Sequence, residues 1–442
     1  MDTVDVMDVL AARDRRAGRQ RQLLAAYAKP LISFTMNIAG PIKRTALIEQ
    51  GFDLGIARLE GQLRACRAAV LHRETVRRDT GCEALYVVDL PAEHLKKLCM
   101  AIEEGDELGR LFDLDVLDGR GVKLERPKER RCLICGEIGK GCARSRRHSV
   151  EELQARTTEI LRRAAAEQEK TRIAEFACRA LLYEACTTPK PGLVDRFGSG
   201  SHTDMDLFTF MAGAAALQPY FARCAAIGQE TAQESPQVTF AALRPAGRLA
   251  EGEMLRSTGG VNTHKGAVFI MGLACAALGR LGRNAWHDTQ RILDACAAMA
   301  AGITAELGHA AHTAGERFYR DYGLRGIRGE AEEGFPSVRK AGLPALEKAL
   351  AEGKSTEQAG CEALLALMSV CEDTALLHRA GYDGWQETKQ RAGQILAHGV
   401  TQEALEQFDR DMIAQNRSPG GSADLLAASF FLLFLSDLTK AE

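Results

Sequence analysis

Residues 150–185 read VEELQARTTEILRRAAAEQEKTRIAEFACRALLYEA, a stretch without glycine or proline. Good helix formers fill it, and Ser149 precedes it as a plausible N-cap residue. We therefore expect one or two helices here and a domain boundary near residues 150–170. A chain of 442 residues is longer than a single hydrophobic core usually grows, so two domains are the expected arrangement.

The secondary-structure pattern differs on the two sides of this stretch. Before it, short β-like runs at residues 31–38 (LISFTMNI) and 84–90 (ALYVVDL) accompany a helical run at residues 44–69. After it, helical segments alternate with Gly/Pro loops, and no run resembles a convincing strand. These helices are expected at residues 206–227, 264–281, 288–316, 356–380, 401–416 and 422–439. The pattern predicts a multidomain protein, with an α+β domain over residues 1–155 and an all-α domain over residues 165–442.

Composition limits the classes of ligand. The 57 Lys and Arg residues nearly balance 59 Asp and Glu residues, so no global field favours nucleic acid or an anionic membrane. The longest apolar run, residues 427–436, is much shorter than the roughly 20 residues that span a bilayer. The acidic start MDTVDVMDVL is unlike a secretory signal, and 13 cysteines suit a reducing compartment. We expect a cytoplasmic protein whose partners are small molecules or proteins.

Four loop segments in the second domain carry residues suited to chemistry. They are PKPGLVDRFGSGSHTDMD (189–206), GGVNTHKG (259–266), GLRGIRGEAEEGFPSV (323–338) and NRSPGGSADLLA (416–427). The second segment begins an apolar helix whose N-terminus suits a phosphate, and Lys265 adds positive charge. Each segment alone could be a helix cap, but together they predict a site for a polyanion and a metal ion. The candidates are Lys190, Asp195, Asp204, Asp206, Asn262, His264, Lys265, Arg328, Ser418, Gly420, Gly421 and Asp424. His202 beside Asp204 could be only a hydrogen-bond partner.

In the first domain, residues 108–117 read LGRLFDLDVL. On a strand, Asp113 and Asp115 would share one face about 7 Å apart, close enough to hold one divalent metal ion, while the apolar residues enter the core. The alternative is a solvated edge strand. Lys43 and Arg110 are candidate phosphate donors, or else surface charges.

Three cysteines and a histidine follow. Cys132, Cys135, Cys142 and His148 have the spacing C-x2-C-x6-C-x5-H, which suits a closed tetrahedral zinc site. The alternative is three reduced thiols and a surface histidine.

The four loop segments of the second domain, in this order over about residues 170–442, resemble the motifs of the triphosphoribosyl-dephospho-CoA synthase family. That resemblance implies a transferase that takes ATP and 3′-dephospho-CoA, releases adenine and forms 2′-(5″-triphosphoribosyl)-3′-dephospho-CoA. Carboxylates suit its oxocarbenium-like transition state, and Mg²⁺ suits the retained triphosphate, so Asp195, Asp204 and Asp206 are the expected catalytic or metal-binding residues. The chain departs from the family at EDTALLHRAGYDG (372–384), which puts direct roles of Thr374 and Arg379 in doubt.

Three stretches of the first domain resemble the holo-citrate lyase synthase family. They are residues 29–43 (KPLISFTMNIAGPIK), 108–117 and 130–148 (RRCLICGEIGKGCARSRRH). That resemblance implies a nucleotidyltransferase-like first domain, which loads a serine of the citrate lyase acyl carrier protein, the γ subunit, and releases pyrophosphate. Mg²⁺ on Asp113 and Asp115 would serve this displacement. Two alternatives remain: the same chemistry serving malonate decarboxylase, and a non-catalytic assembly factor that binds the carrier protein.

Overall fold

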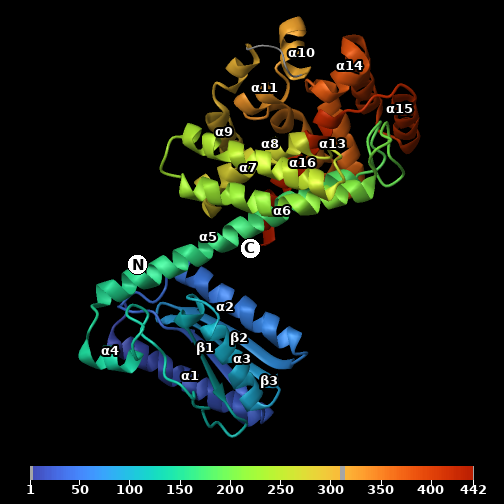
Figure 1. The fold of residues 1–442 in the computed structure, drawn as a ribbon. Coiled ribbons are helices and arrows are strands. Elements are labelled where there is room, and N and C mark those ends of the chain that lie inside the picture. Colours follow the sequence, from blue (N-terminus) through green and yellow to red (C-terminus); the bar gives the residue numbers. More distant parts are fainter. Residues whose placement is uncertain (1–2, 309–313, 442) are drawn as a thin grey trace. The chain divides into compact units, whose positions relative to one another are not determined.

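The computed structural model describes residues 3–308 and 314–441 (Figure 1). The chain divides between Glu167 and Gln168 into two compact units, called here the N-terminal and C-terminal units. The division falls within α5 (Val150–Cys186), a single helix of 37 residues. As predicted, Ser149 caps α5: its Oγ accepts a hydrogen bond from Glu152 N at 3.1 Å, and its own N–H donates to the Glu152 carboxylate.

One antiparallel sheet and three longer helices form most of the N-terminal unit. The sheet has the strand order β2-β3-β1-β4, so β4 lies at an edge. The strands are β1 (Leu31–Met36), β2 (Ala69–Arg78), β3 (Gly81–Asp89) and β4 (Phe112–Leu117), and the helices are α1 (Val6–Tyr27), α2 (Ala46–Ala65) and α3 (Ala92–Glu104). The predicted strands near residues 31–38, 84–90 and 108–117 are confirmed. The predicted helix over residues 44–69 ends at Ala65, and β2, which the sequence analysis does not predict, follows it.

Alternation along the strands gives the sheet two different faces. On one face, Ile32, Phe34 and Leu114 join the apolar side chains of α2 and α3 in the main core of this unit. On the other face, Leu31, Leu85 and Val87 pack with Leu23 of α1. Further along that second face the residues are polar, because Ser33 pairs with Asp115 and Thr35 pairs with Asp113 in the register of β1 and β4. The edge strand therefore presents both aspartates on the face that α1 borders.

The C-terminal unit consists of helices and loops, and no strand occurs among its described residues. The helix α8 packs against α6, α7, α9 and α16, and it is buried along most of its length. The helices of this unit after α5 are α6 (Leu207–Glu230), α7 (Pro236–Ser257), α8 (Lys265–Leu281), α9 (Thr289–Ala300), α10 (Ala314–Tyr322), α11 (Gly326–Glu332), α12 (Leu343–Ala351), α13 (Thr356–Val370), α14 (Thr374–His398), α15 (Gln402–Ala414) and α16 (Gly420–Ala441) (Figure 1). Among the described residues, no helix has the length and apolarity that crossing a membrane requires.

Some predicted helices have different bounds in the structure. The predicted helix over residues 288–316 ends as α9 at Ala300, and part of the predicted span, residues 309–313, lies outside the described residues. The predicted helix over residues 356–380 stops at Val370, because Asp373 accepts hydrogen bonds from Ala375 N and Leu376 N and so begins the separate helix α14. The helices α7 and α12 were not predicted, and α11 lies within the third segment, which was predicted to be a loop.

Two glycines set the distance between α6 and α8. A Cβ atom on Gly228 of α6 would lie 2.1 Å from Ala276 O, and one on Gly279 of α8 would lie 2.1 Å from Ala225 O. Real Cβ atoms do not approach backbone oxygens this closely, so each glycine allows the other helix to make contact. The crossing of α6 and α8 therefore needs glycine at both positions.

Gly228→Ala should destabilise the C-terminal unit by about 2 kcal/mol or more, because overpacking forces the helix backbones apart. Both tryptophans, Trp286 and Trp385, lie in this unit, so denaturant unfolding followed by tryptophan fluorescence measures it. Gly252→Ala in α7 is the matched control, since nothing lies within 4 Å of its Cβ position, and it should leave stability unchanged or raise it slightly. Equal effects of the two substitutions would contradict the packing role.

Candidate active sites

A cavity of about 1100 Å³ opens on the polar face of the sheet in the N-terminal unit. Helix α1, the loop after β1, the edge strand β4 and residues 130–150 all contribute to its wall. Eight basic residues line it against two acidic ones, Glu83 and Asp113. The basic residues are Arg13, Arg16, Lys43, Arg110, Arg130, Arg131, Lys140 and Arg146. Such an excess of positive charge in one recess suits a polyanion.

The two aspartates of β4 differ in their surroundings. Asp113 lines the cavity, and its Oδ1 lies 3.3 Å from Arg130 Nη2. Asp115 pairs with Lys123, whose Nζ lies 2.6 Å from Asp115 Oδ2. The residues between and beside them, Phe112 and Leu114, are buried as the strand pattern predicts. Both carboxylates lie on the expected face, and only Asp113 reaches the cavity wall.

The two predicted phosphate donors both line this cavity. Lys43 donates to Ile38 O, and burial together with the nearby Arg13 lowers the pKa of its amine. Arg110 uses its Nη2 to donate to Arg131 O at 3.0 Å and to Cys132 O at 2.7 Å. Arg110 therefore connects the start of β4 to the cysteine segment.

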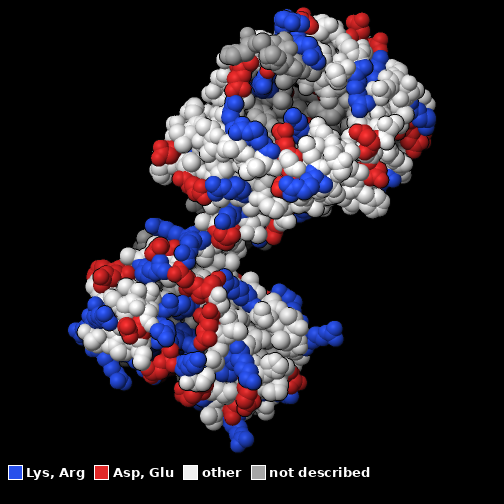
Figure 2. Space-filling model, in the orientation of Figure 1, with Lys and Arg blue, Asp and Glu red and all other residues white. Residues whose placement is uncertain are grey.

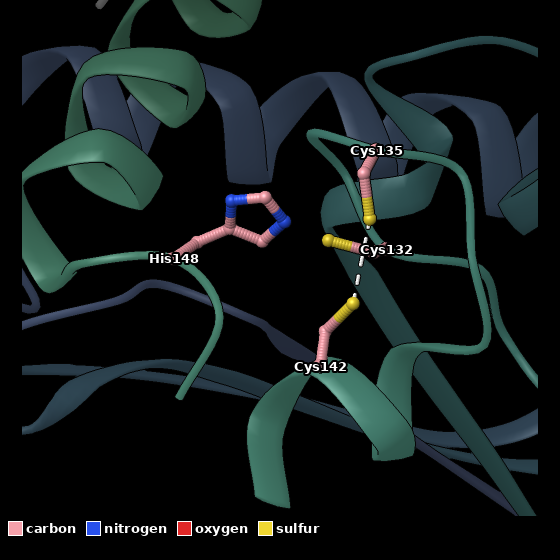
Figure 3. A group of neighbouring side chains, drawn as sticks. All are labelled: Cys132, Cys135, Cys142 and His148. Atoms are coloured by element: carbon pink, nitrogen blue, oxygen red, sulfur yellow. Dashed lines mark hydrogen bonds between the residues drawn. The ribbon is translucent and has the colours of Figure 1, made fainter. Parts of the chain in front are cut away.

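Cys132, Cys135, Cys142 and His148 converge on one point, and one ligand atom from each lies within 4.8 Å of every other (Figure 3). Cys135 Sγ lies 3.4 Å from Cys142 Sγ, close to the roughly 3.8 Å separation that two sulfurs have on one tetrahedral zinc ion. His148 Nε2 is buried and has no hydrogen-bond partner among the described residues, while Nδ1 lies 4.0 Å from Glu152 Oε2. A zinc-bound histidine usually has a carboxylate beyond its other nitrogen, so the donor set fits zinc.

The close packing of these sulfurs shifts the pKa values of two thiols in opposite directions. Burial opposes ionisation of Cys132, but hydrogen bonds from the backbone N–H groups of Cys135 and Ile134 outweigh it, so the pKa of the Cys132 thiol is lowered. The neighbouring Cys135 sulfur raises the pKa of Cys142. Three thiolates this close repel one another, and a divalent cation would relieve that repulsion.

In the C-terminal unit, the first loop segment is held together by buried polar groups. Lys190 is 1% exposed, and its Nζ lies 2.5 Å from Oε1 of Glu184 on α5. Asp195 accepts hydrogen bonds from the backbone N–H groups of Lys190, Phe197 and Gly198. Burial raises the pKa of Glu184, while Lys190 opposes that rise. Glu184 was not predicted from the sequence, where it is one of several glutamates in a long helix.

The end of the first segment contacts the fourth. His202 Nε2 lies 2.9 Å from Ser418 Oγ, and Arg379 Nη2 lies 3.1 Å from His202 Nδ1. Arg379 also donates to Ser201 O and to Asn416 Oδ1. The arginine whose role the family departure left in doubt thus joins both segments.

The second segment meets the first and the fourth at the N-terminus of α8. His264 is buried, and burial together with Lys190 lowers its pKa to about 3, so the ring is neutral at pH 7. Its Nε2 has no hydrogen-bond partner among the described residues. Asp424 accepts a hydrogen bond from Ala267 N, and its carboxylate lies against Gly266, where a Cβ would be 1.9 Å away. Burial, Glu184 and Asp373 raise the pKa of Asp424 well above its usual range.

The third segment is connected to the fourth through residues 372–374. Glu372 accepts hydrogen bonds from the backbone N–H groups of Arg325 and Gly326. The adjacent Asp373 accepts from Ser422 N, Ser422 Oγ and Gly421 N. All four segments are therefore connected within one unit. Asp373, like Glu184, was not predicted from the sequence as a site residue.

Several predicted site residues lie nearer the surface. Asp206 caps α6 through Thr209, and the side chain of Asp204 is 61% exposed, with His202 Nδ1 3.9 Å away. Lys265 is 64% exposed and lies 3.4 Å from Glu251 Oε2. The remaining predicted residues are Asn262, whose Oδ1 accepts from Lys265 N, Arg328, whose Nη1 lies 3.8 Å from Glu316, and Gly420 at the start of α16. Figure 2 shows a hollow on the visible face of this unit with basic and acidic side chains at its edge.

The chain matches two protein families in succession. Residues 4–164 match the family described as apo-citrate lyase phosphoribosyl-dephospho-CoA transferase, and residues 170–442 match ATP:dephospho-CoA triphosphoribosyl transferase. Protein CitXG of Haemophilus influenzae is 37% identical over 96% of this chain and 95% of its own length. Protein CitXG of Leuconostoc mesenteroides subsp. cremoris is 31% identical over 98% of this chain and 97% of its own length. A 2-(5″-triphosphoribosyl)-3′-dephosphocoenzyme-A synthase of Haemophilus ducreyi is 40% identical over 68% of this chain and 99% of its own length.

Lys190→Met should destabilise the C-terminal unit by about 3–5 kcal/mol, because it leaves Glu184 buried without a partner. The double substitution Lys190→Met with Glu184→Gln should recover much of that loss, since it removes both charges. Tryptophan-detected unfolding of Lys190→Met, Glu184→Gln and the double variant measures the coupling, and Lys354→Met, which breaks a more exposed pair with Glu362, is the control. Additive single effects would show that the two side chains do not stabilise each other.

Proposed function

The chain belongs to the ATP:dephospho-CoA triphosphoribosyl transferase family, with an apo-citrate lyase phosphoribosyl-dephospho-CoA transferase preceding it in the same chain, and we propose how its residues carry out the two reactions. The protein is a bifunctional transferase. It makes 2′-(5″-triphosphoribosyl)-3′-dephospho-CoA from ATP and 3′-dephospho-CoA with release of adenine. It then transfers the phosphoribosyl-dephospho-CoA group to a serine of the apo-citrate lyase acyl carrier protein and releases pyrophosphate.

The N-terminal unit carries the transfer step in this proposal, as a nucleotidyltransferase-like domain. The observation that supports this most is that Asp113 lies in a cavity lined by eight basic residues and only one other acidic one. The donor brings a triphosphate, and Arg13, Lys43 and Arg110 can neutralise its phosphates. The α-phosphorus then lies near β4, where the carrier serine attacks and pyrophosphate leaves.

Mg²⁺ fits Asp113 and Asp115, because both offer hard carboxylate oxygens on one face of β4 and both already attract a cation, Arg130 and Lys123. When bound, the ion would polarise the reacting phosphate and neutralise the leaving pyrophosphate. Arg130 Nη1 donates to Phe112 O, which keeps β4 and its aspartates in place while the phosphates bind.

The C-terminal unit carries adenine displacement in this proposal. Asp424 of α16 lies against the N-terminus of α8, near the neutral His264, and its raised pKa favours the protonated carboxyl, which suits proton donation to the departing adenine. Asp195 acts through the loop, because it organises three backbone N–H groups. Asp204 is left available for the triphosphate-bound Mg²⁺ or for the acceptor hydroxyl, whereas Asp206 mainly caps α6.

Zinc is proposed for Cys132, Cys135, Cys142 and His148, on the convergence of their ligand atoms and the unpartnered His148 Nε2. Four protein ligands close the coordination shell, so the ion would be structural and would take no part in the chemistry.

Two substitutions separate the two activities. Asp113→Asn should release adenine from ATP and dephospho-CoA at the normal rate but lose at least about 100-fold in loading of the carrier serine. Asp204→Asn should release little adenine, but it should load the carrier normally when the finished triphosphoribosyl donor is supplied. Adenine release is followed by chromatography and carrier loading by mass spectrometry, with Asp79→Asn on the exposed β2–β3 turn as the control. Loss of both activities in a folded Asp113→Asn protein would contradict the assignment of one reaction to each unit.

The purified protein should contain about one equivalent of zinc by elemental analysis. Cys135→Ser should lose the metal and lower the stability of the N-terminal unit, because a closed zinc site contributes directly to folding. Cys66→Ser is the matched control, since Cys66 is exposed and lies outside the group, and it should keep the full zinc content. Metal-free wild-type protein of unchanged stability would count against the zinc site.

A further inference from the structure

The cysteine and histidine group and the basic cavity share a wall. Cys132, Cys142 and His148 all line the cavity. Four of its eight basic residues lie within two positions of a ligand in the chain: Arg130 and Arg131 precede Cys132, Lys140 precedes Cys142, and Arg146 precedes His148. The positions of these cations therefore depend on what holds the cysteine segment.

Little regular structure holds that segment. Between β4 and α5 it contains α4 (Gly139–Ser145), a helix of seven residues, and isolated bridges such as the one between Arg131 and Ile138. Cys132 N donates to Glu137 O, which closes the loop between the first two cysteines. A short helix and a few backbone hydrogen bonds do not build a core, and small domains of this kind usually take their stability from a metal ion.

Two arginines connect this segment to the reacting strand. The Arg110 guanidinium donates to the carbonyl oxygens of Arg131 and of the ligand Cys132. Arg130 donates to Phe112 O and lies 3.3 Å from Asp113. The metal ligands, the cations of the cavity and the aspartates of β4 thus form one connected set.

We infer that a metal ion held by the four ligands positions the anion-binding wall of the cavity, so that metal binding and binding of a di- or triphosphate group strengthen each other. The cations that contact the phosphates are held at the correct spacing only when the cysteine segment is closed. This inference rests on the proposed zinc site and on the proposed transfer site.

Two coupled binding sites affect each other equally, so the coupling can be measured through zinc binding without an activity assay. If zinc raises the affinity of the cavity for pyrophosphate by some factor, pyrophosphate must raise the affinity for zinc by the same factor. Pyrophosphate in free solution has the opposite tendency, since it is itself a chelator and would remove zinc from a protein with which it did not interact. The two effects change zinc release in opposite directions.

The test uses the full-length, zinc-loaded protein. Zinc release to a competing chromophoric chelator is measured at equilibrium with and without inorganic pyrophosphate, and with orthophosphate as the weakly charged comparison. We expect pyrophosphate to tighten zinc binding, and so to reduce zinc release, by about tenfold in affinity, within the usual range of coupling between two sites. Zinc release that is unchanged or greater with pyrophosphate would overturn the inference.

A substitution tests the connection through Arg110. Arg110→Lys keeps the positive charge and all four metal ligands but replaces the rigid guanidinium, whose Nη2 contacts two carbonyl groups, with an amine on a flexible chain. The variant should bind one equivalent of zinc and lose most of the protection even at pyrophosphate concentrations that saturate it, which separates lost coupling from weaker pyrophosphate binding. Arg58→Lys, which alters a surface pair with Asp106 outside the cavity, should keep the protection. Full protection in Arg110→Lys would contradict a role for this arginine in the coupling.

The outcomes separate this inference from the proposals beneath it. Protein that purifies without zinc and binds none would remove both the zinc site and the inference. Protein that holds zinc and shows the protection but fails to load the carrier would contradict only the transfer function. Protein that holds zinc and loads the carrier, but shows no effect of pyrophosphate on zinc release, would contradict only the coupling. Adenine release in the same sample reports that the C-terminal unit is intact.

Discussion

The buried ion pair between Lys190 and Glu184 is the constraint on which the C-terminal site depends. A lysine that is 1% exposed would be strongly unfavourable alone, so the loop after α5 must return to the helix that supplies Glu184. Once Lys190 is fixed, Asp195 collects the N–H groups of the turn, and Gly192 N donates to Asp409 of α15. The loop is thereby held against α15 and the fourth segment, and His264 becomes a neutral ring beside a buried cation. The charge pair thus anchors the first segment, which in turn contacts the fourth segment through His202 and Ser418 and lies near His264 of the second.

A different constraint shapes the N-terminal unit. The period of two along β4 places Phe112 and Leu114 in the core and therefore places Asp113 and Asp115 on the opposite face. Helix α1 covers only the apolar end of that face, through Leu23, so the polar end remains open and becomes the floor of the cavity. The surrounding cations come from four separate pieces of chain. A short strand motif thus supplies the acids, while the tertiary fold supplies the positive charge.

The sequence predicted those elements whose patterns follow from burial. The strands β1, β3 and β4 carry apolar residues at core positions, so their pattern can be read from the sequence. The cap of α5 can be read in the same way, because Ser149 makes it through local hydrogen bonds. The strand β2 was missed because its residues, AVLHRETVRR, are mostly exposed or half-buried and charged, and it is an edge strand whose partner decides its structure. The helix α7 was missed for a related reason, since Pro245 and charged residues interrupt its apolar stripe, and its contacts with α6, α8 and α9 compensate.

The sequence indicated which residue types form the candidate site better than it indicated the role of each residue. The polar segments were recognised, but Lys190 and Lys265, both in glycine- or proline-rich segments of the sequence, have opposite environments. Lys190 is buried against Glu184, whereas Lys265, the first residue of α8, is largely exposed beside Glu251. Glu184 and Asp373 carry no local signal, because a glutamate near the end of an alanine-rich helix and an aspartate before a helix both have ordinary explanations. What distinguishes them is a buried partner that the folded chain brings to them: Lys190 from the next loop for Glu184, and the distant Ser422 for Asp373. The Cys and His spacing was informative for the opposite reason, since metal ligands must converge within a few ångströms and short spacings make that convergence achievable in a small segment.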